Sequence, residues 1–259
     1  MEKTLHFPDR EIHVSRILSC RFDEKRPTVI FLHEALGSIP QWKSFPLHLC
    51  DALQLPGLII ERTGHGQSSK LIAPRSTDYL HEYTLETEIV IQEILGGIAP
   101  YILIGHSDGG SIALIHASKQ PKHCLGIATM AAHTFVETET LAGIEPAAKA
   151  FEAGKLDGLY KIHGDKTRDL FFAWADTWRH PDFKSWDIRE EIKTIACPVL
   201  ALQGENDQYG TAEQLDSIQV IGSKVQTEII PGCGHHPHLE ASMFVINRIS
   251  NWMLELLEK

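Results

Sequence analysis

Short apolar runs separated by longer segments of helical periodicity are the feature that most restricts how this chain can fold. Six runs read as buried strands: residues 28–32, 57–60, 101–104, 125–130, 199–202 and 225–230. Apolar residues recur at helical spacing between and after them, over 42–53, 80–95, 111–119 and 244–257. Strands that are apolar along their whole length are typical of parallel sheets covered by helices on both faces. The pattern predicts an α/β fold, with residues 5–18 forming an N-terminal hairpin that turns at Pro8.

One long segment interrupts this alternation. Between residues 137 and 190 no strand-like run occurs, and the helical periodicity is accompanied by aromatic side chains that include Trp174 and Trp178. Structureless loops of this length are uncommon in compact domains. We therefore interpret 137–190 as a helical cap inserted into a core formed by residues 1–136 and 191–259. The alternative is a set of extra helices that pack around a core of their own.

Charge and composition exclude several classes of function. The chain carries 24 Lys and Arg against 34 Asp and Glu, a net charge of −10, which disfavours binding to nucleic acid or to an anionic membrane. No stretch approaches the roughly 20 apolar residues of a membrane span, and residues 1–10 lack the apolar core of a signal peptide. We expect a cytoplasmic protein whose partner is a small-molecule substrate. The sequence does not indicate an oligomeric state.

The most informative motif is Gly105-His-Ser107-Asp-Gly109, which directly follows a buried strand and directly precedes a helix. A nucleophile elbow requires this context, because the serine sits on a sharp turn and glycines on both sides let strand and helix approach closely. The turn places the hydroxyl near the free N–H groups of the helix N-terminus, which favour negative charge. A glycine-rich turn with a capping serine, as in nucleotide-binding folds, is the alternative for the motif taken alone.

A serine hydroxyl becomes a strong nucleophile only when a base removes its proton and an acid orients that base. In this fold the chain order is serine, then acid, then histidine, and each follows a strand. Asp207 follows the strand at 199–202 and is the best candidate for the acid, with Glu205 as the second choice. His235 follows the strand at 225–230 and two glycines, and is our candidate for the base.

The three histidines of the last loop also allow a metal-binding interpretation. His235, His236 and His238 lie within four residues, and alternate histidines can bind one ion. Pro237 fixes the backbone between them, and adjacent histidines do not easily face the same ion, so we expect no metal site. Five scattered cysteines without a Cys-x-x-Cys motif likewise disfavour a disulfide framework or a cysteine-based zinc site. Of the 15 histidines, His235 alone receives a specific task.

With these three loops in this order, the chain resembles the α/β-hydrolase family over essentially its whole length. Residues 31–38 (FLHEALGS) stand where the family has a His-Gly-x-x-Gly loop, and residues 62–68 (RTGHGQS) look like its Asp-x-x-Gly-x-Gly-x-Ser loop. The resemblance implies that the backbone N–H groups of Ala35 and Asp108 form an oxyanion hole. Such donors typically contribute a few kcal/mol each to transition-state stabilisation. It implies no cofactor or metal, since the triad is sufficient for acyl transfer.

Three positions depart from the family pattern. Glu34 replaces a glycine, so a carboxylate near the pocket either repels anionic substrates or pairs with a histidine or arginine. Arg62 is read as replacing the aspartate that begins its loop. Asp108 follows the nucleophile where many relatives have an apolar residue, and we expect it to cap the following helix. Further pocket residues are expected from positions in the motif loops and the cap: His33, His106, His236, Trp174 and Trp178.

The resemblance favours a serine hydrolase that cleaves a small to medium carboxylic ester, or a related acyl bond, through an acyl-enzyme. The alternative is a carbon–carbon bond hydrolase or lyase of aromatic breakdown or menaquinone-type metabolism with the same triad. Carbon–carbon hydrolases usually carry Asn before the nucleophile and Trp after the triad histidine, where this chain has His106 and His236. A non-catalytic binding protein of this fold usually lacks a triad residue, and this chain has all three candidates.

Overall fold

The computed structural model describes residues 1–17, 26–71 and 74–258, and one eight-stranded sheet runs through its centre. Its strands are β1 (Glu2–His6), β2 (Glu11–Ile17), β3 (Thr28–Leu32), β4 (Gly57–Glu61), β5 (Tyr101–His106), β6 (Cys124–Met130), β7 (Val199–Gly204) and β8 (Val225–Ile230). Their order across the sheet is β1-β2-β4-β3-β5-β6-β7-β8. β1 and β2 are antiparallel to their neighbours, and the remaining strands run parallel.

All six apolar runs of the sequence are strands, which confirms the predicted α/β fold. β3 and β8 have the predicted bounds, whereas β5 and β7 each extend two residues further. The N-terminal hairpin consists of β1 and β2, joined by a turn in which the Phe7 N–H donates to the Arg10 carbonyl at 2.8 Å. The predicted hairpin ends at Leu18, which lies outside the described residues.

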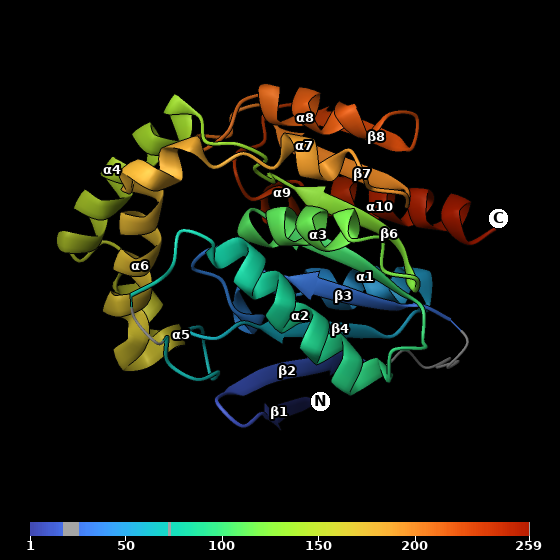
Figure 1. Ribbon diagram of the computed structural model, residues 1–259, viewed down its shortest axis with the longest axis horizontal. Coiled ribbons are helices and arrows are strands. Elements are labelled where there is room, and N and C mark those ends of the chain that lie inside the picture. The colour runs from blue at the N-terminus through green and yellow to red at the C-terminus, as the bar shows by residue number, and fades with distance from the viewer. Residues whose placement is uncertain (18–25, 72–73, 259) are drawn as a thin grey trace.

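Helices cover both faces of the sheet (Figure 1). α1 (Phe45–Leu53) and α10 (Ser242–Leu257) pack on one face, and α2 (Tyr79–Leu95), α3 (Asp108–Ser118) and α8 (Glu213–Ile218) pack on the other. Side chains of β3 alternate between these two cores, with Val29 and Phe31 on the α1 side and Ile30 and Leu32 on the α3 side. Because both faces are buried, every residue of such a strand can be apolar.

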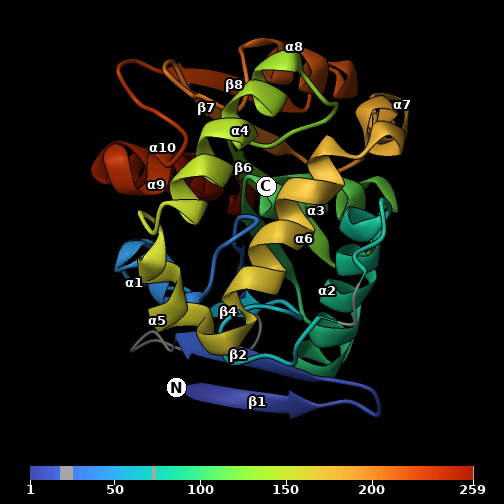
Figure 2. The ribbon, with the colours of Figure 1, turned by 90° about the vertical axis from the view of Figure 1, so that its left-hand side faces the viewer.

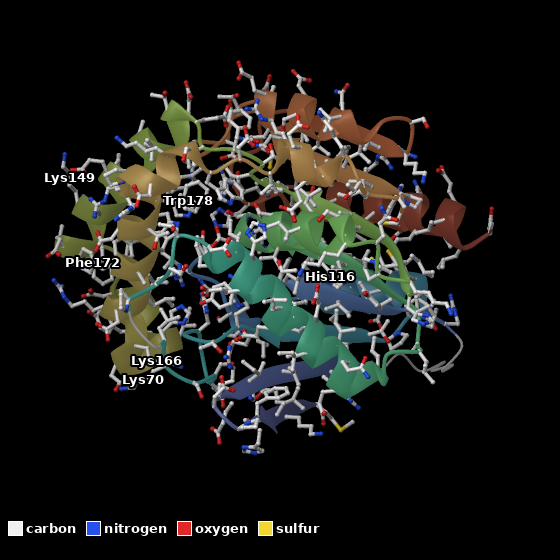
Figure 3. All side chains as sticks on the ribbon, viewed as in Figure 1. Lys70, His116, Lys149, Lys166, Phe172 and Trp178 are labelled. Carbon is white, nitrogen blue, oxygen red and sulfur yellow. The ribbon has the colours of Figure 1, made fainter. Side chains whose placement is uncertain are left out.

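The chain between β6 and β7 is helical, as its periodicity predicts. It contains α4 (Thr138–Glu152), α5 (Tyr160–His163), α6 (Thr167–Arg179) and α7 (Arg189–Ile192). α4, α5 and α6 lie beyond the carboxyl ends of the parallel strands (Figures 1 and 2). Lys149 and Phe172 lie on the outer side of this segment, whereas Trp178 lies on the side toward the sheet (Figure 3). Its interpretation as a separate cap over residues 137–190 stays a prediction.

Part of this helical segment forms its own aromatic core. The rings of Phe151 and Phe171 stack with centroids 4.1 Å apart, and Trp174 meets Phe171 edge-on at 5.5 Å. None of the helices in residues 1–17, 26–71 and 74–258 is both long and apolar enough to span a membrane. The four cysteines in these ranges are unpaired, and Cys20 lies outside them.

Candidate active site

Ser107 lies on the sharp turn between β5 and α3, with a positive φ of 52° that a residue other than glycine rarely adopts. Two glycines make the turn possible. A Cβ on Gly105 would lie 2.2 Å from the Gly109 carbonyl oxygen, and a Cβ on Gly109 would lie 1.9 Å from the Leu32 carbonyl oxygen. A strained backbone of this kind costs on the order of 1–3 kcal/mol and is typical of functional turns.

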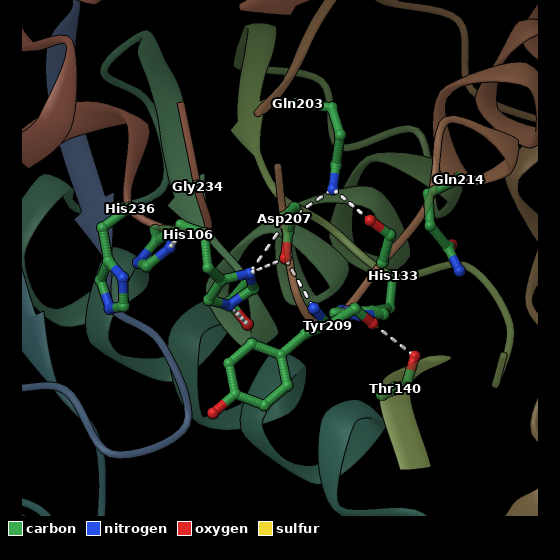
Figure 4. Close-up of polar contacts among 12 residues, drawn as sticks. His106, His133, Thr140, Gln203, Asp207, Tyr209, Gln214, Gly234 and His236 are labelled. Atoms are coloured by element: carbon green, nitrogen blue, oxygen red, sulfur yellow. Dashed lines mark hydrogen bonds and ion pairs between the residues drawn. The ribbon is translucent and has the colours of Figure 1, made fainter. Parts of the chain in front are cut away.

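His235 and Asp207 converge on Ser107 from the loops after β8 and β7. Asp207 lies beside Gln203 and Tyr209 (Figure 4). The His235 Nε2 atom is 3.0 Å from the Ser107 Oγ atom, and its Nδ1 atom lies 2.8 and 2.9 Å from the two carboxylate oxygens of Asp207. A carboxylate can only accept, so Nδ1 carries the proton and Nε2 can accept the proton of the serine hydroxyl. A Cβ on Gly204 would lie 2.1 Å from the Gly234 carbonyl oxygen, so only glycine lets the two loops approach this closely.

Asp207 is held in place by donors that its neighbours provide. Its side chain is fully buried, and its carboxylate accepts from the Tyr209 N–H at 2.8 Å and from the Gln203 Nε2 group at 2.6 Å. Glu205, the second candidate for the acid, instead accepts from the Gly232 N–H at 2.8 Å. The structure therefore places Asp207, and not Glu205, beside His235.

Burial and the contact between the two side chains set the protonation states of His235 and Asp207. It lowers the pKa of His235 to about 4, although the nearby Asp207 carboxylate acts in the opposite direction. Burial raises the pKa of Asp207, but the His235 hydrogen bond, the His235 charge and the Tyr209 N–H together bring that pKa below its usual value. At neutral pH the imidazole is therefore neutral and the carboxylate is charged. This is the combination that can remove a proton from Ser107.

Two backbone N–H groups beside Ser107 are available to a ligand. Ala35 and Asp108 both line the cavity at the serine. Neither N–H has an acceptor among the described residues, and that of Asp108 belongs to the first turn of α3, where the helix provides no partner. Donors of this kind can stabilise negative charge that develops on an oxygen bound beside Ser107.

The cavity at Ser107 has a volume of about 240 Å³ and lies between the strand ends and the helices α4 and α6. Its inner wall is apolar and consists of Ile144, Ala147, Leu156, Leu159, Phe171 and Trp174. Of the predicted pocket residues, Glu34, Trp174, Trp178 and His236 line it. No lysine or arginine of the described chain lines it. The cavity can therefore hold an apolar group next to the nucleophile and offers no cation for an anionic one.

His33 and His106 do not line this cavity, contrary to the sequence prediction. His33 is fully buried behind the loop, where its Nδ1 group donates to the Glu34 carbonyl at 2.7 Å and its Nε2 atom accepts from the Arg62 N–H at 3.2 Å. His106 is the last residue of β5 and packs against His238 on the α1 side of the sheet, with ring centroids 4.6 Å apart. Side chains along a strand alternate between the two faces of the sheet. This alternation points the His106 side chain to the α1 side and away from the cavity at Ser107.

Glu34 and His106 lie next to each other. His106 Nε2 lies 2.7 Å from the His235 carbonyl oxygen and donates to it, because a carbonyl oxygen can only accept. His106 Nδ1 lies 3.4 Å from a Glu34 carboxylate oxygen. Glu34 thus pairs with a histidine, which was one of its two predicted roles.

The sequence predicts that Asp108 caps the elbow helix, but the structure does not bear this out. Among the described residues, no side chain accepts from the free N–H groups of α3. Its buried carboxylate accepts from the Tyr79 hydroxyl at 2.9 Å, and Trp178 Nε1 donates to that hydroxyl at 2.8 Å. Burial raises the pKa of Asp108, and the positive charges of Arg62 and Arg75 oppose the rise. Asp108 thus links the elbow to α2 and, through Trp178, to α6.

The acidic residue of the 61–68 loop is Glu61, one position before the expected one. Its carboxylate accepts from the Gln67 N–H at 2.6 Å and from the Ile39 N–H at 3.1 Å, so it holds the loop together. Counting back three positions from Gly64 gives Glu61, so the reading of Arg62 as the replaced aspartate is wrong. Arg62 instead donates to the carbonyls of His33 and Glu34.

His133 is a cavity residue that the sequence analysis did not identify. It lies just after β6, its Nε2 group donates to the Tyr209 carbonyl at 2.9 Å, and its ring centroid is 6.3 Å from that of His235. The position of His133 in the sequence could have indicated this role, because β6 ends at the same edge of the sheet as β5, β7 and β8. His236 and His238 do not form a metal cluster with His235, and no group of three potential metal ligands occurs in the described part of the chain.

A mostly parallel sheet with a serine on the turn after β5, and with acid and histidine after the last two strands, defines an enzyme of the α/β-hydrolase fold. The chain belongs to the alpha/beta hydrolase family, whose model matches residues 29–247.

Curated relatives and solved structures agree with this assignment. A 2-succinyl-6-hydroxy-2,4-cyclohexadiene-1-carboxylate synthase from Enterobacter sp. is 24% identical over 241 residues, which is 83% of this chain and 86% of the relative. The proline iminopeptidase of Mycobacterium smegmatis has a TM-score of 0.74 at 18% identity, covering 99% of this chain and 98% of its own. E-2-(acetamidomethylene)succinate hydrolase has a TM-score of 0.75 at 20% identity, covering 98% of both chains. At these identities the solved structures show a shared fold.

Proposed function

We propose that this enzyme is a serine hydrolase that cleaves carboxylic esters with a small to medium apolar acyl group. Ser107 Oγ attacks the acyl carbon while His235 Nε2 takes the hydroxyl proton. The developing oxyanion is bound by the N–H groups of Ala35 and Asp108. His235 then protonates the leaving alcohol, and the ester C–O bond breaks to give an acyl-enzyme. Water attacks this intermediate through the same base, which releases the acid and restores Ser107.

The observation that carries the proposal is the 3.0 Å contact from Ser107 Oγ to a His235 imidazole whose other nitrogen is held by Asp207. Two N–H groups without an acceptor among the described residues lie beside that oxygen and suit an acyl transition state. The apolar wall and the volume of about 240 Å³ favour an acyl group smaller than a typical drug-sized ligand.

The curated relatives favour a second candidate, a lyase-type reaction that yields a 2-succinyl-6-hydroxycyclohexadiene carboxylate. Their printed product carries a succinyl group and a carboxylate, and anions of this kind are usually bound by arginine or lysine. No lysine or arginine lines the described cavity. Its two carboxylates already have partners, since Glu34 pairs with His106 and Asp108 accepts from the Tyr79 hydroxyl. These features make the ester hydrolase the better supported candidate.

A fluorophosphonate probe tests the proposal directly, because it modifies only a serine that a neighbouring base activates. We expect labelling of the wild type, none of Ser107→Ala, and turnover of p-nitrophenyl esters with short acyl chains. Equal labelling of Ser107→Ala, or no labelling of the wild type, would refute a Ser107 hydrolase. Labelling without ester turnover, together with formation of the relatives' printed product, would favour the second candidate.

A further inference from the structure

Four consecutive carbonyl groups of residues 33–36 accept hydrogen bonds from buried side chains. Arg62 donates to the His33 carbonyl at 2.5 Å and to the Glu34 carbonyl at 2.8 Å. His65 lies 2.9 Å from the Ala35 carbonyl oxygen, and His163 lies 3.0 Å from that of Leu36, in each case through Nε2. We call Arg62, His65 and His163 the carbonyl clamp. The side chain of each is at most 2% exposed.

The clamp acts on the peptide group that carries the Ala35 N–H. A trans peptide is planar, so the Glu34 carbonyl and the Ala35 N–H point in opposite directions from the same plane. The Glu34 carbonyl accepts from Arg62 Nη2 at 2.8 Å, from His33 Nδ1 at 2.7 Å and from the Gly37 N–H at 3.0 Å. Arg62 is the only charged donor of the three, and together they direct the Ala35 N–H toward the cavity beside Ser107. A charge-assisted bond to the carbonyl also polarises the amide and makes its N–H a stronger donor.

His163 connects this loop to the helical segment. Its Nδ1 atom accepts from the Gly66 N–H at 2.9 Å, so the proton is on Nε2, which donates to the Leu36 carbonyl. His163 is the last residue of α5, almost 100 positions from Gly66 and more than 100 from Leu36 in the sequence. The helical segment therefore reaches the loop that carries Ala35 without taking part in the chemistry at Ser107.

We infer that Arg62 and His163 are positioning residues that hold the Ala35 N–H in the orientation required for an oxyanion. The inference rests on the proposed function for its catalytic consequence, and its structural part can be tested without activity. Because the oxyanion exists only in the transition state and the tetrahedral intermediate, loss of the clamp lowers kcat and leaves KM nearly unchanged.

Arg62→Lys is the first test, since lysine keeps the positive charge that faces Asp108 but cannot bind two carbonyls with a planar fork. We expect kcat for a short p-nitrophenyl ester to fall about 10- to 100-fold, which is less than the loss of a whole oxyanion donor, with KM changing less than about threefold. Circular dichroism and thermal unfolding show whether the variant is folded. A folded variant with wild-type kcat, or with equal changes in kcat and KM, overturns the inference.

A matched pair at position 163 decides the question even if Arg62→Lys does not fold. Glutamine can place an N–H donor near the position of Nε2, whereas asparagine can place only an acceptor near that of Nδ1. We expect His163→Gln to keep kcat within about twofold and His163→Asn to lower it about five- to tenfold, the effect of one hydrogen bond. Equal kcat values for the two variants would contradict the inference.

Lys70 provides the control, because it joins the helical segment to the neighbouring loop without contacting the clamp or residues 33–36. Its Nζ group donates to the Asp165 carboxylate at 2.6 Å. Lys70→Met should loosen that attachment and leave kcat close to wild type. A fall in kcat as large as that of His163→Asn would show that general anchoring, and not the carbonyl contact, is what matters.

The amide resonance of Ala35 in 15N-alanine-labelled protein separates this inference from the proposed function. It should move in Arg62→Lys and His163→Asn by more than the scatter of alanine amides far from the loop, and stay in place in His163→Gln and Lys70→Met. If fluorophosphonate does not label the wild type, the proposed function fails while this resonance still reports on the clamp. An Ala35 resonance that stays in place in Arg62→Lys overturns the clamp itself.

Discussion

On one side of Ser107, hydrogen bonds connect side chains, from Asp207 through His235 to the serine hydroxyl. On the other side, they run from side chains to main-chain carbonyls of residues 33–36. We call the first the base side of Ser107 and the second its oxyanion side. Histidine is present on both, but only His235 has a nitrogen that faces the nucleophile. His163 uses both ring nitrogens to join backbone groups of two loops.

The difference gives a reason for some of the histidines in this chain. A neutral imidazole has one donor and one acceptor at fixed positions on a rigid ring, so it can join two backbone groups in a buried place without carrying charge. Burial lowers the pKa of His33 and of His163, so both stay neutral near pH 7. On the oxyanion side histidine is thus a connector, whereas on the base side it is the group that exchanges a proton.

The largest effect is expected from a change on the base side. Asp207→Asn should lower kcat about 10⁴-fold, because an amide can donate to Nδ1 and so favour the tautomer that cannot accept the serine proton. Glu205→Gln is the matched control and should retain wild-type kcat, since Glu205 contacts the Gly232 N–H and not His235. Steady-state kinetics with a p-nitrophenyl ester measures both. Similar losses of kcat in the two variants would mean that Asp207 is not the residue that orients His235.

A change in the apolar wall of the cavity should leave both sides intact. Ile144 is fully buried in the apolar wall, and Ile144→Trp would fill part of the volume of about 240 Å³. We expect kcat/KM for octanoyl esters to fall about 10- to 100-fold, because overpacking typically costs 1–3 kcal/mol, while acetyl esters are cleaved as before. An equal loss of kcat/KM for octanoyl and acetyl esters would mean that the acyl group does not bind beside Ile144.

The base side could be predicted from the sequence because each of its residues follows an apolar strand within a few positions. The oxyanion side could not, because a hydrogen bond to a main-chain carbonyl leaves no pattern in the sequence and its donors come from distant segments. Loop position alone predicts His33 and His106 in the pocket, whereas the direction of a side chain at a strand end depends on the alternation along that strand. The motif read from Arg62 is off by one position, because its neighbour Glu61 occupies the motif position.

The pH dependence distinguishes the two sides, because His235 must be neutral to act as a base. Its pKa is lowered to about 4, so kcat/KM should be nearly constant from pH 7 to about 5. Below about pH 4 it should fall about tenfold per pH unit as the imidazole becomes protonated. Circular dichroism over the same range checks that the protein stays folded. An acid limb near the ordinary histidine pKa would indicate that His235 is more solvated than its buried position implies.

The smallest effect is expected at Glu34, where the two sides meet. Glu34 precedes Ala35 and pairs with His106, which in turn donates to the His235 carbonyl. In Glu34→Gln the amide can donate to Nδ1 of a neutral His106, so the bond to His235 is retained and kcat should change by no more than about tenfold, the range of one hydrogen bond. Glu34→Leu removes the partner of Nδ1 and should be the more damaging variant. If Glu34→Gln instead lost as much activity as Asp207→Asn, Glu34 would belong to the base side, and the separation between the two sides would fail at this residue.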